Sequence, residues 1–292
     1  MKDLAVLITV YNDEEGLVSA LDSIRETDNS FTVVVVDGAS DPPLVLRPEA
    51  YPFETVLIRQ EERSGIIGGL NEGLDYVRSQ GFRYLARFDA GDLQRENRLG
   101  IQYALLEESE HLAMVGSNAV FRSEESGEDL FVTDLPLDPE SIRKWSVFQT
   151  CFIHPTVMMR LDRIADSFRY ETRYLHIEDY VLFSRIAERY KTANIDEPLV
   201  ECFVREAGIS RSNDAAQLRS GLRHHLEHPR PFNLLWHAYV LKRLVYLVTP
   251  YQMRLKCKRW IGFVKPAAGA NSSKALSPSV IRPRKTEGTG SL

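Results

Sequence analysis

The first sixty residues contain three short apolar runs, and the spacing of the first two constrains the fold most. Residues 4–10 (LAVLITV) and 31–36 (FTVVVV) are apolar at every position or nearly so, as parallel strands covered on both faces must be. Between these runs, residues 14–25 place apolar side chains at helical spacing. A strand, a helix and a strand in this order predict a βαβ unit, and hence an α/β fold with a mainly parallel sheet flanked by helices.

The same alternation continues along the chain. Further strands are expected at 55–59, 83–88, 112–121, 151–160 and 199–204, and helices at 68–78, 95–108, 138–148 and 178–190. Residues 233–248 form an apolar helical pattern, whereas 266–292 are rich in Ala, Gly, Ser and Pro and are predicted to be disordered. We therefore expect a large α/β body followed by a helical extension and a tail.

Charge is distributed unevenly along the 292 residues. Residues 1–232 carry 25 Lys and Arg against 40 Asp and Glu, a balance of −15, whereas residues 233–285 carry 11 basic residues and no acid. An acidic body is unsuited to nucleic acid, which needs clustered positive charge. The basic segment favours an anionic partner.

Cysteine use and hydropathy indicate the compartment. The three cysteines, Cys151, Cys202 and Cys257, are odd in number and far apart, so they predict neither a disulfide framework nor a zinc site. We interpret them as buried small hydrophobic residues in a reducing, cytoplasmic environment. No apolar run reaches the ~18 residues that a membrane-spanning helix needs.

Acidic residues follow two of the predicted parallel strands. Asp37 and Asp41 come after the second strand, and Asp89 and Asp92 come after the strand at 83–88. Ligands of open parallel sheets bind beyond the carboxyl ends of the strands, and carboxylates gathered there favour a divalent cation that carries phosphate. The chain has neither G-x-x-x-x-G-K-[ST] nor an early G-x-G-x-x-G, which disfavours a P-loop enzyme and a dinucleotide dehydrogenase.

These residues occur in an order that resembles the family 2 glycosyltransferases of the bacterial surface-polysaccharide type. The matching segments are Val10-Tyr11-Asn12, Val36 to Asp41, Arg63-Ser64-Gly65 with Gly69-Leu70-Asn71, Arg87 to Asp92, His154-Pro155-Thr156, and Glu178-Asp179-Tyr180. The resemblance implies a GT-A fold, with a Rossmann-like mixed sheet and a C-terminal helical extension. It implies a catalytic domain at 1–212, with a nucleotide-sugar half at about 1–110 and an acceptor half at about 111–212. Residues 213–265 are then the extension.

On the donor side, the resemblance implies a role for each matching residue. Asp37 binds the base of the nucleotide by accepting the N3 proton of uracil or thymine, and Asp92 ligates Mn²⁺ or Mg²⁺ on the diphosphate with help from Asp89. The other implied cofactor-binding residues are Tyr11, Asn12, Arg63 and His154, the last of them near the metal.

On the acceptor side, the resemblance implies that Asp179 is the general base and that Glu178 orients the acceptor or the donor sugar. One base and no evident nucleophile predict a single displacement with inversion. The family commonly has an acid at the position of Gly91, so D-x-G-D replaces D-x-D-D. We expect metal binding to be retained through Asp92 but weakened, and the alternative is a loss of metal dependence.

Structural alternatives exist for these residues. The Asp-Gly pair is a common turn, Asp89 and Asp92 can cap the following helix, and acids at 178–179 suit a helix N-terminus. His154 is equally a candidate core residue, and His224, His225 and His228 are expected at the surface rather than on a metal.

The expected function is the transfer of a sugar from a UDP- or dTDP-sugar to a lipid-linked glycan acceptor in surface polysaccharide or lipopolysaccharide assembly. The alternatives are a non-catalytic nucleotide-sugar or glycan-binding module, motivated by Gly91, and a sugar nucleotidyltransferase. Basic residues among apolar neighbours at 233–265 predict peripheral attachment to an anionic membrane surface at the inner face of the cell membrane. The alternative for this segment is a helical pair that packs on the catalytic body.

Overall fold

The computed structural model describes residues 1–204, 214–249, 253 and 264–265. Some of the sequence predictions fall outside this part of the chain. They are the disordered tail at 266–292, the basic cluster at 254–259, and Cys257.

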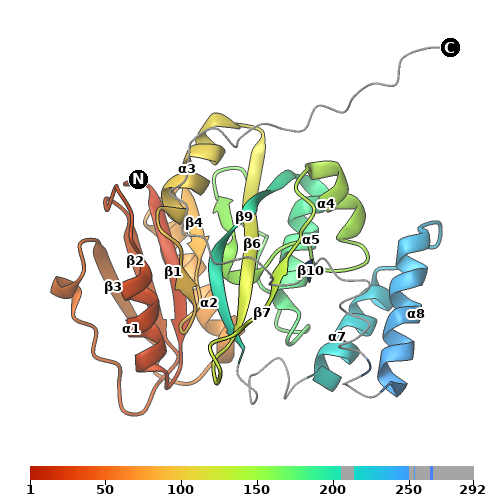
Figure 1. Cartoon of the computed structure of the whole chain (residues 1–292), viewed down its shortest axis with the longest axis horizontal. Helices are drawn as coiled ribbons and strands as arrows, with labels where there is room; N and C mark the ends of the chain where they lie inside the picture. The colour runs from red at the N-terminus through yellow and green to blue at the C-terminus, as the bar shows by residue number, and fades with distance from the viewer. Residues whose placement is uncertain (205–213, 250–252, 254–263, 266–292) are drawn as a thin grey trace.

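A parallel sheet forms the N-terminal half, with four strands in the order β3-β2-β1-β4 (Figure 1). The strands are β1 (Leu4–Val10), β2 (Thr32–Asp37), β3 (Glu54–Arg59) and β4 (Tyr84–Arg87). The connections contain α1 (Glu14–Ser23), the short 3₁₀ helix η1 (Pro48–Ala50) and α2 (Gly65–Ser79). Because β1, β2 and β4 are parallel neighbours, their carboxyl ends reach the same edge of the sheet.

Helices on both faces explain why β1 and β2 are apolar throughout. Alternate residues of β1 such as Val6 and Ile8 pack in one core with Leu17 of α1, whereas Leu7 packs in a second core with Leu70 of α2. Successive side chains of a strand point to opposite faces, so a strand between two helical layers has no polar face. At Gly73 of α2, a Cβ atom would lie 2.2 Å from the Leu7 side chain, so only glycine allows this close approach.

The C-terminal half extends the sheet with strands of mixed direction. The long strand β6 (Leu112–Ser123) runs parallel to β9 (Lys191–Val204) and antiparallel to β7 (Asp129–Thr133) and β8 (Met158–Arg160). β8 also joins β4, which connects the two halves. Two short strands, β5 (Leu93–Gln94) and β10 (Val264–Lys265), pair with β9 and β7. The result is a mixed, mostly parallel sheet, as predicted.

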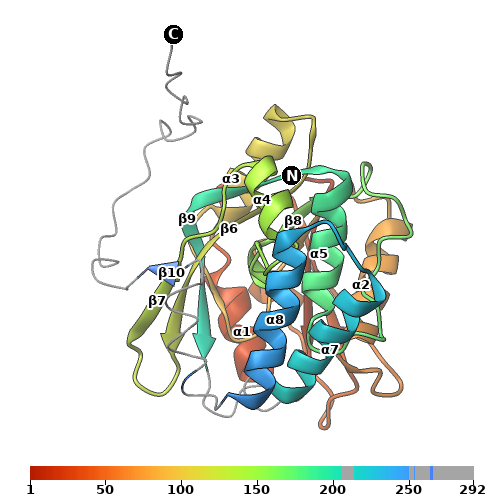
Figure 2. The same cartoon turned by 90° about the vertical axis from the view of Figure 1, so that its right-hand side faces the viewer.

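The remaining helices cover the sheet and one of its ends. They are α3 (Arg98–Glu108), α4 (Pro139–Trp145), the 3₁₀ helix η2 (His154–Thr156), α5 (Glu178–Arg189), α7 (Asp214–Glu227) and α8 (Leu234–Val248). Figure 2 shows α7 and α8 together on the outer side of α5, at the end of the molecule remote from β3. No helix within the described ranges is long and apolar enough to span a membrane.

Three predicted elements differ from the structure. The last strand begins at Lys191 rather than residue 199, and the helix expected at 95–108 begins at Arg98 because Leu93 and Gln94 pair with β9. The strand expected at 151–160 is divided into η2 and β8 around Pro155. Cys151 and Cys202 are free and buried, as predicted.

Candidate active site

The loops after β1 and β2 are joined by hydrogen bonds. The Asn12 N–H donates to Ser40 Oγ at 2.9 Å, and the Asp41 N–H donates to Asn12 Oδ1 at 2.9 Å. Asn12 adopts a φ of 51°, a left-handed conformation that asparagine tolerates better than most residues. Asn12 therefore fixes the shape of this loop pair, whatever it does toward a ligand.

Asp37 is wholly buried at the end of β2. Its Oδ1 accepts the Ser40 N–H at 2.9 Å, and its Oδ2 pairs with Arg59 Nη1 at 2.5 Å. The Arg59 side chain is 42% exposed, so it is the part of this ion pair that reaches the surface. A nucleobase that approaches this edge therefore meets Arg59 first, because the Asp37 carboxylate is buried and paired.

Tyr11 and Arg63 lie together at the same edge of the sheet. The Arg63 guanidinium carbon is 3.9 Å from the centre of the Tyr11 ring, a cation–π contact. Both side chains are exposed, and they come from the loops after β1 and before α2. The structure thus brings together two residues that the sequence assigned to one pocket.

A buried arginine organises the carboxyl end of β4. Arg87 Nε donates to His154 Nε2 at 3.1 Å, and the Arg87 Nη2 group pairs with Asp89. The Tyr170 hydroxyl lies 3.0 Å from the same histidine nitrogen. Desolvation and the neighbouring Arg87 charge lower the pKa of His154 to about 3, so the imidazole is neutral and its Nε2 can accept the hydrogen bond from Arg87 Nε.

Asp92 is the buried member of a carboxylate pair. Desolvation and the Asp89 charge raise the pKa of Asp92 to about 7. Its Oδ1 accepts the N–H of Phe203 on β9 at 3.1 Å, and the Cys202 thiol also hydrogen-bonds to it. Gly91 between the two acids has a φ of 89°, which only glycine adopts without strain. The glycine at this position therefore matches the local backbone.

The donor set of Asp89 and Asp92 fits a divalent cation. The charge of Asp89 raises the pKa of Asp92, and a positive ion would stabilise both carboxylates. Mg²⁺ is typically held by one or two carboxylates together with substrate phosphates. Within the described chain, no three His, Cys, Asp or Glu side chains gather to enclose a metal. A site made of two carboxylates and a diphosphate agrees with both observations.

Glu178 and Asp179 open α5, and both carboxyl groups lie within electrostatic reach of Asp89. Desolvation, followed by the charges of Glu178 and Asp89, raises the pKa of Asp179 to about 7, although part of its side chain reaches solvent. Desolvation also raises the pKa of Glu178, which is 8% exposed, and Asp89 adds to this effect. Glu178 Oε2 is buried without a hydrogen-bond partner, so it can accept a hydrogen bond from the hydroxyl group of a bound ligand.

The predicted site residues therefore form two groups at one edge of the sheet. The first group surrounds the ends of β1 and β2, and its members are Tyr11, Asn12, Asp37 and Arg63. The second lies at the end of β4 and the start of α5, and its members are Asp89, Asp92, His154, Glu178 and Asp179.

Four side chains in these groups had no predicted role. They are Arg59, Arg87, Tyr170 and Cys202, each in contact with a predicted residue. The sequence signal for Arg87 is a charged residue within an apolar strand run, which requires a buried partner. The other three have no such signal, because packing brings them to the site.

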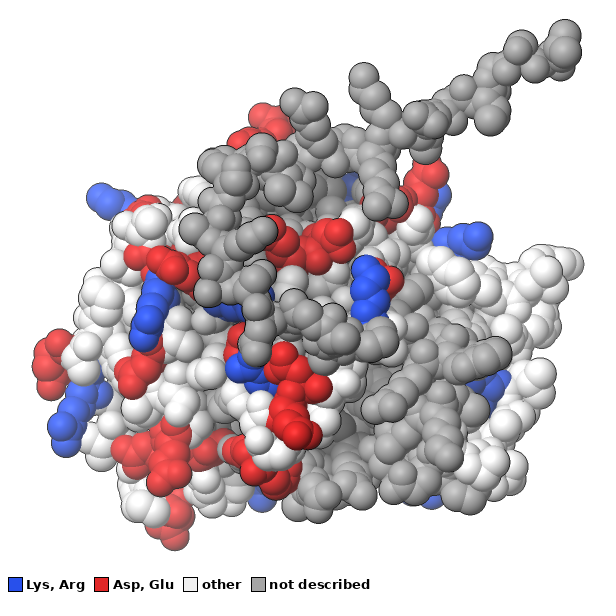
Figure 3. Space-filling view, viewed as in Figure 1, with Lys and Arg blue, Asp and Glu red and all other residues white. Residues whose placement is uncertain are grey.

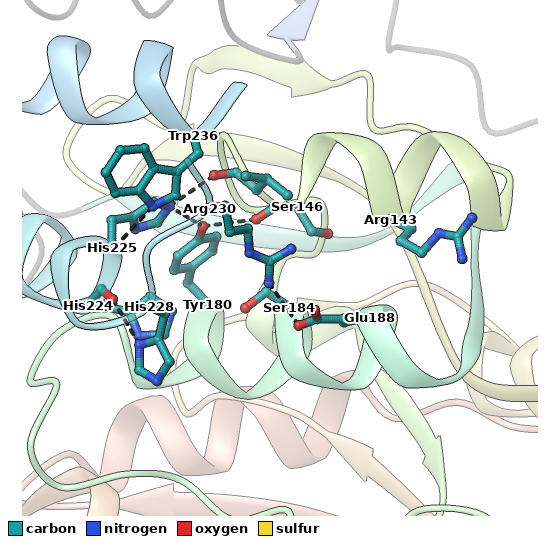
Figure 4. A pocket seen from close by; sticks show the side chains of 11 residues that line it. Arg143, Ser146, Tyr180, Ser184, Glu188, His224, His225, His228, Arg230 and Trp236 are labelled. Atoms are coloured by element: carbon teal, nitrogen blue, oxygen red, sulfur yellow. Dashed lines mark hydrogen bonds and ion pairs between the residues drawn. The ribbon is translucent and has the colours of Figure 1, made fainter. Parts of the chain in front are cut away.

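The histidines near residue 225 belong to a separate cavity between α4, α5, α7 and α8 (Figure 4). His225 was expected at the surface, but it is 4% exposed and stacks on Tyr239 with ring centres 3.5 Å apart. His225 Nε2 lies 2.9 Å from the Val147 carbonyl oxygen, and Arg230 pairs with Glu188 at 2.9 Å. These contacts hold α7 on the body. None of the predicted donor-binding residues lines this cavity.

Comparison with known proteins identifies the family to which the chain is related. A family model described as glycosyl transferase family 2 matches residues 5–168, more than half of the chain. The amylovoran biosynthesis glycosyltransferase AmsB of Erwinia amylovora is 24% identical over 279 residues, which cover 88% of this chain and 86% of the relative.

Two solved structures share the fold. Staphylococcus aureus TarS 1–349 in complex with UDP-GlcNAc has a TM-score of 0.58 and 15% identity, with 82% of this chain and 71% of that chain covered. The mannosyltransferase PcManGT of Pyrobaculum calidifontis, in complex with GDP-Man and Mn²⁺, has a TM-score of 0.57 and 20% identity, with 89% and 76% covered.

These matches confirm the predicted GT-A architecture and the expectation of a transferase. They decide against a binding module and a nucleotidyltransferase. The extent of the family match leads to one conclusion: the chain belongs to glycosyl transferase family 2.

Proposed function

We propose that this enzyme transfers a sugar from a UDP- or dTDP-sugar to a glycan hydroxyl with inversion at the anomeric carbon, assisted by Mn²⁺ or Mg²⁺. The observation that carries the proposal is the convergence of Asp179, in the first turn of α5, with Asp89, in the loop after β4. The charge of Asp89 contributes to the raised pKa of Asp179, so the two carboxylates lie in one electrostatic environment. Asp89 lies on the donor side of the proposed site, and Asp179 lies on the acceptor side.

Asp179 is suited to act as the general base. A base works best when its pKa lies near the operating pH, and the pKa of Asp179 is raised to about 7. The acceptor oxygen attacks the anomeric carbon, the bond from that carbon to the diphosphate oxygen breaks, and Asp179 takes the acceptor proton. Glu178 Oε2, which has no hydrogen-bond partner in the protein, accepts a hydrogen bond from a sugar hydroxyl and thereby orients the sugar.

Asp92 and Asp89 are the residues that would hold the cation. When bound, a divalent ion supplies charge stabilisation for the departing diphosphate. The Mn²⁺ in the PcManGT complex and the nucleotide sugars in both neighbouring structures support this assignment. Arg87 fixes the Asp89 carboxylate, and neutral His154 accepts a hydrogen bond from Arg87 without adding positive charge.

We assign the end of the site that binds the nucleobase of the donor to Tyr11, Asn12, Asp37 and Arg63. The preference for uracil or thymine rests on Asp37, a buried carboxylate that forms an ion pair with the partly exposed Arg59. UDP-GlcNAc in the TarS complex supports a uridine donor. The acceptor is proposed to be a growing surface polysaccharide or lipopolysaccharide, carried on a lipid at the cytoplasmic face of the membrane. The name of AmsB, an amylovoran biosynthesis glycosyltransferase, supports the polysaccharide.

The stereochemistry and the base are tested together. The reaction is run with a nucleotide sugar and an acceptor that give turnover, and NMR of the anomeric proton gives the configuration of the product. The parent, Asp179→Asn and Glu188→Gln are compared. Glu188 lies on the same helix and outside the candidate site, so it is the matched control. We expect an inverted product, a loss of kcat of about 10²–10⁴-fold in Asp179→Asn, and near-parental turnover in Glu188→Gln. A retained anomeric configuration, or an Asp179→Asn variant with parental kcat, would contradict the proposal.

A further inference from the structure

Helix α8 has its charged side chains turned inward. Its only two Lys or Arg residues are Lys242 and Arg243. Lys242 Nζ donates to the Phe148 carbonyl oxygen at 3.3 Å and lies 3.8 Å from the centre of the Phe148 ring. The Arg243 guanidinium carbon lies 4.9 Å from the centre of the buried Tyr239 ring. The two charges of α8 therefore face the body of the protein, which is the reverse of an ordinary surface helix.

The outward side of α8 is largely apolar. Its exposed residues recur at three- and four-residue intervals, the spacing of one helical face, and His237 is the one polar residue among them. They form what we name the outer stripe, with side chains 85, 63, 47, 48 and 84% exposed at Leu234, Leu241, Leu244, Val245 and Val248. Phe232, just before the helix, is also fully exposed. A largely apolar stripe of this kind marks an interaction surface rather than scattered exposed residues.

The charge of the C-terminal part of the sequence indicates what covers the outer stripe. Residues 233–285 contain 11 basic residues and no acid, whereas the preceding 232 residues have a balance of −15. On the face in Figure 3, acidic side chains are spread over the body, whereas the right-hand edge, where α8 lies in Figure 1, is mainly uncharged. An anionic surface attracts this segment and repels the body, which favours one orientation.

The length of α8 sets how it can meet a membrane. Its 15 residues span about 22 Å, which is shorter than the ~30 Å hydrocarbon core of a bilayer. A helix of this length with one apolar face lies in the plane of the interface. We propose that the outer stripe of α8 docks on an anionic lipid surface, with the stripe in the boundary between headgroups and acyl chains.

This docking connects the membrane to the helix that carries the candidate base. The Tyr180 hydroxyl donates to the Ser146 carbonyl oxygen at 2.9 Å and lies 3.3 Å from His225 Nε2 on α7, which packs against α8. Tyr180 directly follows Asp179 on α5. The inward face of the α7–α8 pair thus packs against α5 and the segment at Ser146, and the outward face of α8 is the one that can contact lipid. Lipid docking goes beyond the proposed transfer reaction and does not require it.

The experiment uses the full chain without nucleotide sugar, so its failure leaves the proposed reaction untouched. Sedimentation with vesicles of phosphatidylcholine, and of phosphatidylcholine with phosphatidylglycerol, is measured for the parent and for a double variant, Leu241→Gln with Val245→Gln. Glutamine is a good helix former, so helix propensity is preserved. Val45→Gln, at a residue 69% exposed and remote from α8, is the control.

We expect the parent and the control to bind the anionic vesicles, and the double variant to bind at least tenfold more weakly with an unchanged circular dichroism spectrum and melting temperature. Equal binding of the double variant and the parent would overturn the proposal. So would failure of the parent to bind anionic vesicles. Light scattering after size exclusion provides the other outcome: a dimer that the double variant dissociates would assign the outer stripe to a second copy of the chain and contradict lipid docking.

Discussion

Arg87 forms an ion pair with Asp89 from a position that is wholly buried, two residues before it in the chain. The same guanidinium donates to His154 and to the carbonyl oxygens of Leu7 and Phe88. One side chain thus fixes the end of β4, the η2 segment and a carboxylate of the candidate metal site. The orientation of Asp89 depends on a residue that no ligand contacts directly.

Arg87→Lys is expected to destabilise the fold. Lysine keeps the charge but cannot reproduce the planar fork, so several buried acceptors lose their partner. We predict a loss of about 3–5 kcal/mol in the free energy of unfolding, the cost of a broken buried ion pair, measured by urea denaturation. The control is Arg83→Lys, because Arg83 is 40% exposed and its ion pairs lie at the surface. A change there of about 0–1 kcal/mol is expected. Equal losses in both variants would show that the burial of Arg87 is unimportant.

Asp92→Asn is expected to change how stability depends on pH in protein freed of metal by EDTA. The folded-state pKa of Asp92 is raised by burial to about 7, well above the ordinary value of an aspartate, so the folded state holds this proton over a range in which the unfolded state has released it. The parent therefore loses stability as the pH rises from about 4 to about 7, and the variant lacks this loss.

The difference between the melting curves of parent and Asp92→Asn measures this effect directly. At pH 5 the two proteins should be closer in stability than at pH 8, where the variant gains on the order of 3 kcal/mol relative to the parent. Groups that do not interact with Asp92 titrate equally in both proteins and cancel. A difference that does not change with pH would mean that Asp92 is not desolvated as described.

Substitutions at Gly91 test whether the backbone, rather than the metal, selects glycine between the two acids. The φ of 89° penalises any residue with a Cβ. Gly91→Ala is expected to cost about 1–2 kcal/mol, and Gly91→Asn less, because asparagine tolerates left-handed conformations. Thermal unfolding of both variants provides the measurement. If Ala and Asn are both tolerated at no cost, the loop does not require this conformation.

The sequence was sufficient to predict the parallel half of the sheet. The runs at 4–10 and 31–36 are apolar on both faces because α1 and α2 cover both sides. The strand β9 was only partly predicted, since its first half includes Asp196, Glu197 and Pro198 and has no apolar run. It is a strand because it pairs with β6, a contact between distant parts of the chain.

The position of the candidate acids also followed from the sequence, since parallel strands bring Asp37 and Asp92 to one edge. Their surroundings could not be predicted. The pairing of Asp37 with Arg59, and the inward direction of Lys242, depend on which side chains tertiary packing places opposite them. Local patterns describe the spacing of residues along an element but not the partners that a neighbouring element supplies.

The most direct test of the donor site is a thermal-stability titration with UDP-, dTDP- and GDP-sugars, with and without Mn²⁺, on the parent and on Asp92→Asn. Ligands that bind only the folded state raise the melting temperature. We predict that one UDP- or dTDP-sugar stabilises the parent, that Mn²⁺ increases the shift, and that Asp92→Asn loses the contribution of Mn²⁺ alone. If no nucleotide sugar shifts the melting temperature in either condition, or if Asp92→Asn keeps the full effect of Mn²⁺, the site around Asp89 and Asp92 is not the donor site.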